Sequence, residues 1–201
     1  MTDFNFKPKL SKTGFGWHSR GYLPHLDADE ECQFVTFRLF DSLPQVVLEK
    51  WAAEGISDAL LRKRSEVYLD AGYGECWLKL PAVAAKVRDA IFYHAGKKFD
   101  LISWVIMPNH VHLLISMRAK EHLPEVMHSI KSFSAQDANK HLKRKGQFWM
   151  HESFDRYIRD YRHYAAVVKY IENNPVKAGL CERPEDWRFG SASTRSAIAD
   201  E

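Results

Sequence analysis

The sequence predicts an α+β domain that is built on one antiparallel sheet, with helices packed mainly on one face. Two kinds of pattern support this fold class: short segments in which polar and apolar residues alternate, and longer segments in which apolar residues recur every three or four positions. Along the chain these segments follow the order strand, helices, two strands, helix, strand, helix, without an internal repeat. The 201 residues are enough for a single domain with a sizeable core.

The composition is that of a globular protein, with 45% hydrophobic and 27% charged residues. No apolar run approaches the ~18 residues of a membrane span, and the N-terminus lacks the basic and apolar regions of a secretory signal. We therefore expect a cytoplasmic protein with no membrane partner. The three cysteines are too widely separated for a disulfide framework or a zinc site. A net charge of +3 permits a polyanionic partner without requiring one.

We divide the chain into an N-terminal arm (1–30), a central domain (31–180) and a C-terminal tail (181–201). The arm mixes basic residues, among them Arg20, with glycines, prolines and aromatic residues. This mixture suits single-stranded nucleic acid, through phosphate pairing and base stacking. It suits equally well an arm that packs its aromatic residues onto the domain.

The central domain begins with a strand over residues 33–40, where apolar and polar side chains alternate. Helical spacing of apolar residues then runs from Asp41 to Leu61, and the glycines of the segment 72–74 interrupt the chain. A further helix is predicted over residues 81–96, because proline suits its first turn and glycine its end. We expect these helices to be structural.

The two central strands, 99–106 and 111–116, are rich in β-branched residues and meet at a tight connection through Pro108-Asn109. Side chains alternate across a strand, so His110 and His112 project from one face. The residues between and after them project from the other face, and these are Val111, Leu113 and Ile115. One face therefore carries imidazoles, and the other is predicted to be core.

A long amphipathic helix is predicted over residues 121–145, before Gly146, and its far end is basic. The basic side chains of this helix could contact a phosphate backbone, although a charged run is also typical of a solvated helix face. The candidates for DNA contact are Lys131, Lys140, Lys143, Arg144 and Lys145.

A short strand over residues 154–158 and a final helix complete the domain. Asp160 can cap this helix, which we expect to end before Pro175. On it, Tyr170 and Asn174 are four residues apart and therefore point in the same direction. If the helix lies on the imidazole face of the sheet, a phenol and an amide come close to the two histidines.

These residues predict phosphodiester cleavage by a tyrosine with help from a metal ion. His110 and His112 offer neutral ring nitrogens to one divalent cation, and the amide oxygen of Asn174 suits magnesium or manganese. A phenol is a poor nucleophile at neutral pH, but a cation that polarises the phosphoryl oxygens lowers the barrier to attack. We expect Tyr170 to attack in line and to form a covalent phosphotyrosine, from which the strand can be resealed.

Other residues of the final helix compete for these roles. At about 100° per residue, Tyr161 and Tyr164 point roughly 180° and 120° away from Tyr170, so we interpret them as core or surface tyrosines. Asn173 is the rival amide ligand, but it is rotated further from the direction of Tyr170. His163 shares the face of Tyr170 but lies roughly 10 Å along the helix axis, which favours contact with DNA over metal binding.

Two sequence motifs follow one another along the chain: Met107-Pro-Asn-His-Val-His-Leu-Leu and Tyr170-Ile-Glu-Asn-Asn-Pro-Val-Lys-Ala-Gly-Leu180. Supporting motifs are Arg20-Gly-Tyr-Leu-Pro-His25, Ser153-Phe-Asp-Arg-Tyr-Ile-Arg-Asp160 and Asp186-Trp187. The set runs through most of the chain. It resembles the single-tyrosine HUH transposases of bacteria and, more narrowly, the REP-associated tyrosine transposases, which are tied to short palindromic repeats. The chain departs from the family at Tyr161, where an acidic residue is often found.

The resemblance implies a ferredoxin-like fold of the HUH-endonuclease type, with Mg²⁺ or Mn²⁺ on His110 and His112, the nucleophile at Tyr170 and an amide ligand at Asn174. It also implies a single-stranded DNA hairpin of the REP-palindrome type as the substrate. The enzyme would cleave and rejoin this DNA through a covalent 5'-phosphotyrosine. Relatives include monomers and homodimers, so the resemblance is compatible with either oligomeric state.

Two other functions stay open at this point. A non-catalytic protein could keep the same fold to bind hairpin DNA or RNA, using the basic helix end and the N-terminal arm. A metal-dependent hydrolase that activates water is the third function considered. The chain offers no third imidazole and no clustered carboxylates at a suitable spacing for such a site.

Overall fold

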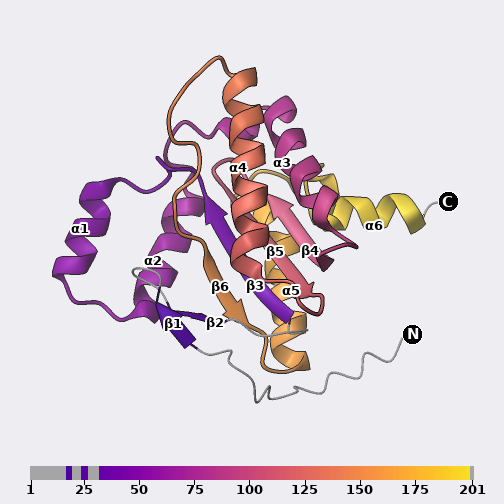
Figure 1. Cartoon of the computed structure of the whole chain (residues 1–201), viewed down its shortest axis with the longest axis horizontal. Coiled ribbons are helices and arrows are strands. Elements are labelled where there is room, and N and C mark those ends of the chain that lie inside the picture. The colour runs from indigo at the N-terminus through magenta and orange to yellow at the C-terminus, as the bar shows by residue number, and fades with distance from the viewer. Residues whose placement is uncertain (1–16, 20–23, 27–31, 200–201) are drawn as a thin grey trace.

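A computed structural model of the chain describes residues 17–19, 24–26 and 32–199 (Figure 1). Its centre is a four-stranded antiparallel sheet with the strand order β4-β5-β3-β6. The strands are β3 (Cys32–Arg38), β4 (Phe99–Ile106), β5 (His110–Met117) and β6 (Phe154–Tyr157). This arrangement confirms the predicted α+β class and the predicted central pair of strands.

Helices lie on both faces of the sheet (Figure 1). The helices α3 (Pro81–His94) and α4 (Leu123–His141) cover one face, and α5 (Tyr161–Lys177) packs on the other. The prediction places helices mainly on one face of the sheet, and the structure adds α5 on the opposite face. The remaining described elements are β1 (Trp17–Ser19), β2 (Pro24–Leu26), α1 (Gln45–Ala53), α2 (Asp58–Asp70), η1 (Trp77–Lys79), η2 (Pro184–Asp186) and α6 (Ser191–Ala199).

The two faces of β5 bury different residues, as the alternation along this strand predicts. Val111 and Leu113 pack with the apolar side chains of α3 and α4. On the other face, Leu114 packs with Val167 and Ile171 of α5. Because residues 110, 112 and 114 share one face of the strand, the two histidines lie on the side that α5 covers.

Two of the predicted helices have different bounds in the structure. The helical spacing over 41–61 belongs to two helices, α1 and α2, which are separated at Gly55 with a φ of +60°. The helix predicted over 121–145 spans Leu123–His141, and the backbone of Lys143 takes a positive φ of 51° beyond it. Glycine and positive φ values interrupt helices because the left-handed conformation does not continue the hydrogen-bond ladder.

The prediction that the final helix ends before Pro175 is wrong, since α5 continues to Lys177 with Pro175 inside it. A proline removes one backbone N–H from the ladder and is most costly in a helix interior. Pro175 lies in the last turn, close to the helix end. Its carbonyl accepts a hydrogen bond from the N–H of Leu180 at 2.9 Å, and Gly179 takes a φ of +69° to close the turn.

Asp160 caps α5, as the sequence predicts: its side-chain oxygen accepts a hydrogen bond from the N–H of His163 at 2.8 Å. Loss of such a cap typically costs about 1 kcal/mol. We therefore expect Asp160→Ala to lower the free energy of unfolding by about 1 kcal/mol in urea denaturation. Asp89→Ala, which removes an exposed carboxylate of α3, is the control and should change it by less than about 0.5 kcal/mol. Equal losses in the two variants would contradict the capping role.

The segment after α5 packs along β4, at one edge of the sheet. The indole nitrogen of Trp187 donates to the carbonyl of Ile106 at 3.0 Å, and the N–H of Ile106 donates to the carbonyl of Phe189 at 2.8 Å. The hydroxyls of Ser103 and Ser191 lie 3.0 Å apart. The predicted tail (181–201) thus covers an edge strand through its first residues, which also leaves fewer unpaired backbone groups there.

Within the predicted arm, the described strands β1 and β2 pair antiparallel. Arg20, the DNA-contact candidate of the arm, lies outside the described residues. In the described part of the chain, no helix has the length and apolar character needed to cross a membrane.

Candidate metal and nucleophile site

The two histidines of the first motif meet at the start of β5. His110 and His112 are fully buried, and their Nε2 atoms lie 3.1 Å apart. Burial lowers the pKa of His110 to about 3 and the pKa of His112 well below its ordinary value, with a smaller effect from Lys177 on both. Both imidazoles are therefore neutral at neutral pH, which is the form that binds metal ions.

Asn109 determines which nitrogen of His110 carries the proton. The amide nitrogen of Asn109 donates to the backbone carbonyl of Tyr73 at 2.9 Å, so its oxygen is the atom that faces His110 Nδ1 at 2.8 Å. That oxygen can only accept, and His110 therefore carries its hydrogen on Nδ1. The lone pair is left on Nε2, which points toward His112. An oriented ring of this kind is typical of metal-binding histidines.

Thr36 holds His112 in a comparable way. Its hydroxyl lies 2.8 Å from His112 Nδ1, and the two residues face one another across the β3–β5 pair. A hydroxyl can donate or accept, so Thr36 can support either tautomer of His112. With a cation on Nε2, Nδ1 of His112 would donate to Thr36. The ring of Phe34 stacks on His112, with centroids 5.3 Å apart, and fixes the plane of the imidazole.

Tyr170 comes to this histidine pair from α5 of the same chain. Its ring centroid lies 5.3 Å from that of His112 and 5.9 Å from that of Phe34. The hydroxyl is buried and makes no hydrogen bond to the described residues. Burial raises the pKa of Tyr170, and the carboxylates of Glu66 and Asp70 on α2 add to the increase. In this structure the phenol is therefore protonated at neutral pH.

Asn174 completes the group, as its spacing from Tyr170 predicts. It is fully buried, and it lies close enough to His110 and Tyr170 to shift the pKa of each toward the charged form. Within the described chain neither polar atom of its amide has a hydrogen-bond partner of good geometry. The rival amide, Asn173, instead donates to the carbonyl of Lys169 at 2.9 Å. Of the two amides, the structure brings Asn174 to the histidines.

The donor set fits a divalent cation. Two adjacent ligands at about 2.1 Å from an octahedral ion are roughly 3 Å apart, and the histidine Nε2 atoms are separated by 3.1 Å. The buried amide of Asn174 and the hydroxyl of Tyr170 lack partners in the described part of the chain, which in a native structure calls for an explanation such as a ligand or ion. Among the described residues no group of three or more histidine, cysteine or acidic side chains could form a different metal site.

Lys177 supplies positive charge beside this site. Its ammonium nitrogen lies 5.8 Å from the centre of the Tyr170 ring and 2.6 Å from an Asp70 carboxylate oxygen. The pair joins the end of α5 to the end of α2. Because Lys177 is exposed and the ion pair is partly solvated, we attribute little stability to it.

The predicted DNA contacts of α4 fall into two groups. Lys140, Lys143 and Lys145 are exposed. Arg144 instead forms hydrogen bonds within the protein: it donates to the amide oxygen of Asn139 at 2.8 Å and to the carbonyl of residue 147 at 3.1 Å. Arg144 also lies 6.0 Å from the Trp77 ring, next to the segment that bonds to the turn before His110. The basic helix end therefore shares one end of the sheet with the histidines, but on the opposite face.

The other two DNA-contact candidates have contacts within the protein. The ammonium of Lys131 donates to the carbonyl of His151 at 2.7 Å, and burial lowers its pKa to about 8. His163 accepts a hydrogen bond from the N–H of Arg159 at 3.3 Å, in the first turn of α5. Both residues thus have structural contacts, and neither is brought to the histidine pair.

Asn109 and Thr36 were not singled out in the sequence, although they orient the histidines. The sequence indicates only a turn at Asn109. Thr36 occupies an inward position in an alternating strand, and a polar residue at such a position is a signal that could have drawn attention to it. Its partner depends on the register between β3 and β5, which the sequence does not specify.

The chain matches the family model of IS200-like transposases over residues 83–174, just under half of its length. That range includes His110, His112 and Tyr170 and ends at Asn174. A REP-associated tyrosine transposase of Escherichia coli is 28% identical over 96 residues, which cover 47% of this chain and 55% of the relative. A Haemophilus influenzae protein classed with the same transposases is 26% identical over 103 residues, covering 46% of this chain and 58% of the relative.

A solved structure, described as a REP-associated tyrosine transposase bound to a REP hairpin, has a TM-score of 0.53 with this chain. The match covers 90% of this chain and 86% of the other, at 18% sequence identity. At this identity the likeness concerns the fold, and it confirms the predicted fold class. With the family match over the site residues, the resemblance predicted from the motifs is confirmed as well: the chain matches the IS200-like transposase model over residues 83–174 and resembles the REP-associated tyrosine transposases in sequence and in fold.

Proposed function

We propose that the protein is a metal-dependent transposase that cleaves and rejoins single-stranded DNA carrying a hairpin, through a covalent 5'-phosphotyrosine on Tyr170. The observation that carries this proposal is the contact between the Tyr170 ring and His112 within one chain, with the amide of Asn174, which has no partner in the described residues, beside them. Two imidazoles of one motif and a phenol and an amide of the other thus lie together, and this arrangement supports the proposal. The chemistry needs nothing from a second protomer, so a monomer would suffice for it.

In the proposed reaction the Tyr170 oxygen attacks the phosphorus and loses its proton, and the bond from phosphorus to the 3'-oxygen breaks. The products are a free 3'-hydroxyl and a 5'-phosphotyrosine, and the reverse attack by a 3'-hydroxyl reseals the strand. His110, His112 and Asn174 would hold Mg²⁺ or Mn²⁺. When bound, such a cation polarises the phosphoryl oxygens and favours the phenolate. Thr36 and Asn109 keep the imidazoles oriented before the substrate arrives.

The proposed substrate is a DNA hairpin of the REP type. Support comes from relatives named REP-associated tyrosine transposases and from the similar fold of one that is bound to a REP hairpin. The exposed lysines near the end of α4 are available for contact with phosphates, and we keep Lys140, Lys143 and Lys145 as candidates. Such contacts predict binding that weakens with rising salt concentration.

The test is an assay for protein that becomes covalently linked to DNA. Labelled hairpin oligonucleotides with single-stranded flanks are incubated with the full chain and Mg²⁺ or Mn²⁺, and the products are separated on a denaturing gel. We expect a labelled, SDS-stable adduct that a chelator abolishes. A cleaved strand with a free 5'-phosphate and no adduct would instead indicate hydrolysis by activated water, and would contradict the tyrosine mechanism.

The burial of the Tyr170 hydroxyl favours a second candidate function, a hairpin-binding protein whose catalysis is idle. A buried phenol with a raised pKa is poorly suited to attack until a substrate or cation changes its surroundings. The second function predicts hairpin binding that Tyr170→Phe leaves unchanged, and no adduct at any metal concentration. Any adduct formed by the parent protein excludes it.

Thr36→Val tests the orientation of His112 without removing a metal ligand. Valine keeps the shape of the side chain but cannot bond to Nδ1. We expect Mn²⁺ to bind about 10- to 100-fold more weakly, the usual effect of losing such a partner, in isothermal titration calorimetry. Thr194→Val, at an exposed position of α6, is the matched control and should bind Mn²⁺ as the parent does. Unchanged affinity in Thr36→Val would show that Thr36 does not support a metal ligand.

A further inference from the structure

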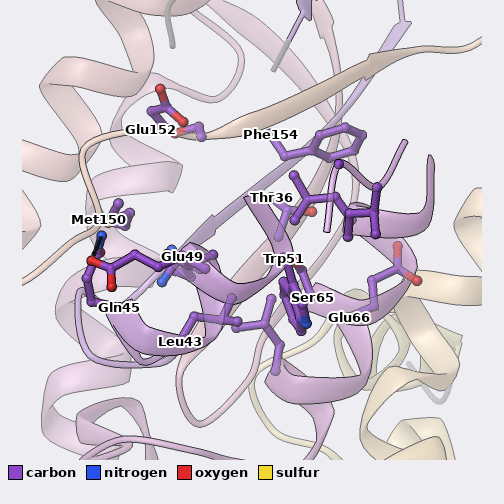
Figure 2. A pocket seen from close by; sticks show the side chains of 17 residues that line it. Thr36, Leu43, Gln45, Glu49, Trp51, Ser65, Glu66, Met150, Glu152 and Phe154 are labelled. Atoms are coloured by element: carbon purple, nitrogen blue, oxygen red, sulfur yellow. Dashed lines mark hydrogen bonds between the residues drawn. The ribbon is translucent and has the colours of Figure 1, made fainter. Parts of the chain in front are cut away.

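A cavity of about 460 Å³ lies beside the histidine and tyrosine site, over β3 and β6 (Figure 2). Thr36 and Arg38 of β3 line it, together with Phe154 of β6. The helices α1 and α2 supply the other wall, through residues that include Trp51 and Ser65. In Figure 2 the Phe154 ring lies above Thr36 and Trp51 lies below it.

Three of the lining residues connect the cavity to the proposed active site. Thr36 bonds to His112, and Arg38 lies directly across from His110 in the β3–β5 pair. Residues that face one another in an antiparallel pair project from the same side of the sheet. Glu66 also lines the cavity, and its charge acts on the Tyr170 hydroxyl. A group in the cavity would therefore be a direct neighbour of a phosphate held at the histidines.

Arg38 provides a cation at this position. The side chain is half-buried and, among the described residues, donates one hydrogen bond, to the Ser42 hydroxyl at 3.2 Å. Burial lowers its pKa to about 10, with an opposing effect from Glu152, so Arg38 stays charged at neutral pH. A planar guanidinium has several donors, and a single bond to Ser42 leaves others for a phosphate or a base edge.

The lining suits a base better than a second phosphate. The cavity has apolar walls, formed by Trp51, Phe154, the leucines of α1 and α2, Leu43 before α1 and Ile56 between the two helices. The acidic residues at its border, Glu49, Glu66 and Glu152, would repel further phosphates. The volume is within the range of about 300–1,000 Å³ that is typical of small-molecule sites, which admits a single nucleotide and excludes a duplex.

We propose that this cavity binds one unpaired nucleobase of the single-stranded DNA, belonging to a nucleotide that flanks the cleaved phosphate. The base enters between the aromatic side chains of α1 and β6, and Arg38 contacts the adjacent phosphate or the base edge. Enzymes that act on DNA extrude bases into pockets of this kind, where stacking and hydrogen bonds hold them. The inference rests on the proposed function in that it takes single-stranded DNA as the substrate.

The experiment combines a pocket-filling variant with base removal. Ser65→Trp places a large side chain in the cavity wall, and Ser65→Ala at the same position leaves the cavity open. A hairpin oligonucleotide, selected for binding from a pool with randomised flanks, is then prepared in versions that each lack one flanking base. Binding to the full chain is measured by fluorescence anisotropy, and thermal unfolding checks that both variants are folded.

In the parent and in Ser65→Ala, loss of one particular base should weaken binding about 5- to 150-fold, as expected for one base–aromatic contact. Ser65→Trp should bind the intact hairpin more weakly by a similar factor and be insensitive to removal of that same base. Equal sensitivity of all three proteins at every position would overturn the pocket.

Binding does not require cleavage, so the result is separate from the test for a covalent adduct. If an adduct forms but no base removal affects the parent and Ser65→Trp differently, the proposed function stands and this inference is overturned. If removal of one base weakens binding by the parent but not by Ser65→Trp, and no adduct forms, this inference stands and the proposed cleavage is overturned. If Ser65→Trp is unfolded, Arg38→Gln replaces it, and the same loss of sensitivity to one base or its phosphate is expected.

Discussion

Tyr170→Phe should form no covalent adduct with hairpin DNA. The substitution removes a single oxygen, the atom that attacks phosphorus in the proposed reaction, and phenylalanine offers no other nucleophile. Loss of a nucleophile typically lowers catalysis by a factor on the order of 10⁴ or more. The measurement is the labelled adduct on a denaturing gel, with metal ion present and with parent protein alongside.

The stability of this variant distinguishes a chemical role of Tyr170 from a structural one. Its hydroxyl is buried without a hydrogen-bond partner among the described residues, and an unsatisfied buried polar group costs about 1–3 kcal/mol. Tyr170→Phe should therefore unfold at the same or a higher urea concentration than the parent. The aromatic contacts with Phe34 and His112 need only the ring.

Tyr161→Phe is the matched control, because Tyr161 is 69% exposed at the start of α5. It should form the adduct at the parental rate. If Tyr161→Phe lost the adduct and Tyr170→Phe kept it, the nucleophile would have been assigned to the wrong tyrosine, whereas equal activity in both would place the nucleophile elsewhere.

The parts of the site that local periodicity determines could be predicted from the sequence. The alternation along β5 placed His110 and His112 on one face, and the helical spacing placed Tyr170 and Asn174 on one side of α5. The side of the sheet on which α5 packs was a hypothesis, and the structure bears it out. The local patterns are reliable here because one side of each element is apolar and must be buried.

The features that were missed depend on tertiary contacts or on single backbone positions. The partners Thr36 and Asn109 follow from strand register and from the loop that carries Tyr73. The break between α1 and α2 occurs at a glycine with positive φ, inside an otherwise regular apolar spacing. Pro175 was treated as a stop signal, although a proline in a last turn removes a single hydrogen bond and can be tolerated.

The sequence also does not show which basic side chains form hydrogen bonds within the protein. Lys131 and Arg144 belong to the same set of basic residues, along the predicted helix 121–145, as the exposed Lys140, Lys143 and Lys145. In the structure both bond to backbone carbonyls of the segment that leads toward β6. A charge pattern therefore identifies a set of candidates for DNA contact, and packing decides which of them are free to make it.

His110→Ala and His112→Ala should each abolish metal-dependent cleavage, because each removes one of the two imidazole ligands proposed. Removing a residue that only hydrogen-bonds to a metal ligand typically lowers metal affinity about 10- to 100-fold. Removing a ligand itself should therefore lower the affinity by at least about 100-fold. Mn²⁺ is a suitable probe, since its binding can be followed by electron paramagnetic resonance as well as by calorimetry. The readout on binding is independent of cleavage.

The neighbouring asparagines of α5 offer a sharper comparison. Asn174 lies beside the histidines, and neither polar atom of its amide has a hydrogen-bond partner among the residues that the structure describes, whereas Asn173 donates to the carbonyl of Lys169. We expect Asn174→Ala to weaken Mn²⁺ binding about 10- to 100-fold and to slow adduct formation, and Asn173→Ala to do neither. Both substitutions remove the same group from adjacent positions of one helix, so a general effect on α5 would appear in both. A larger loss in Asn173→Ala would mean that the amide ligand has been assigned to the wrong residue, and equal affinity in Asn174→Ala and the parent would remove the amide from the metal site.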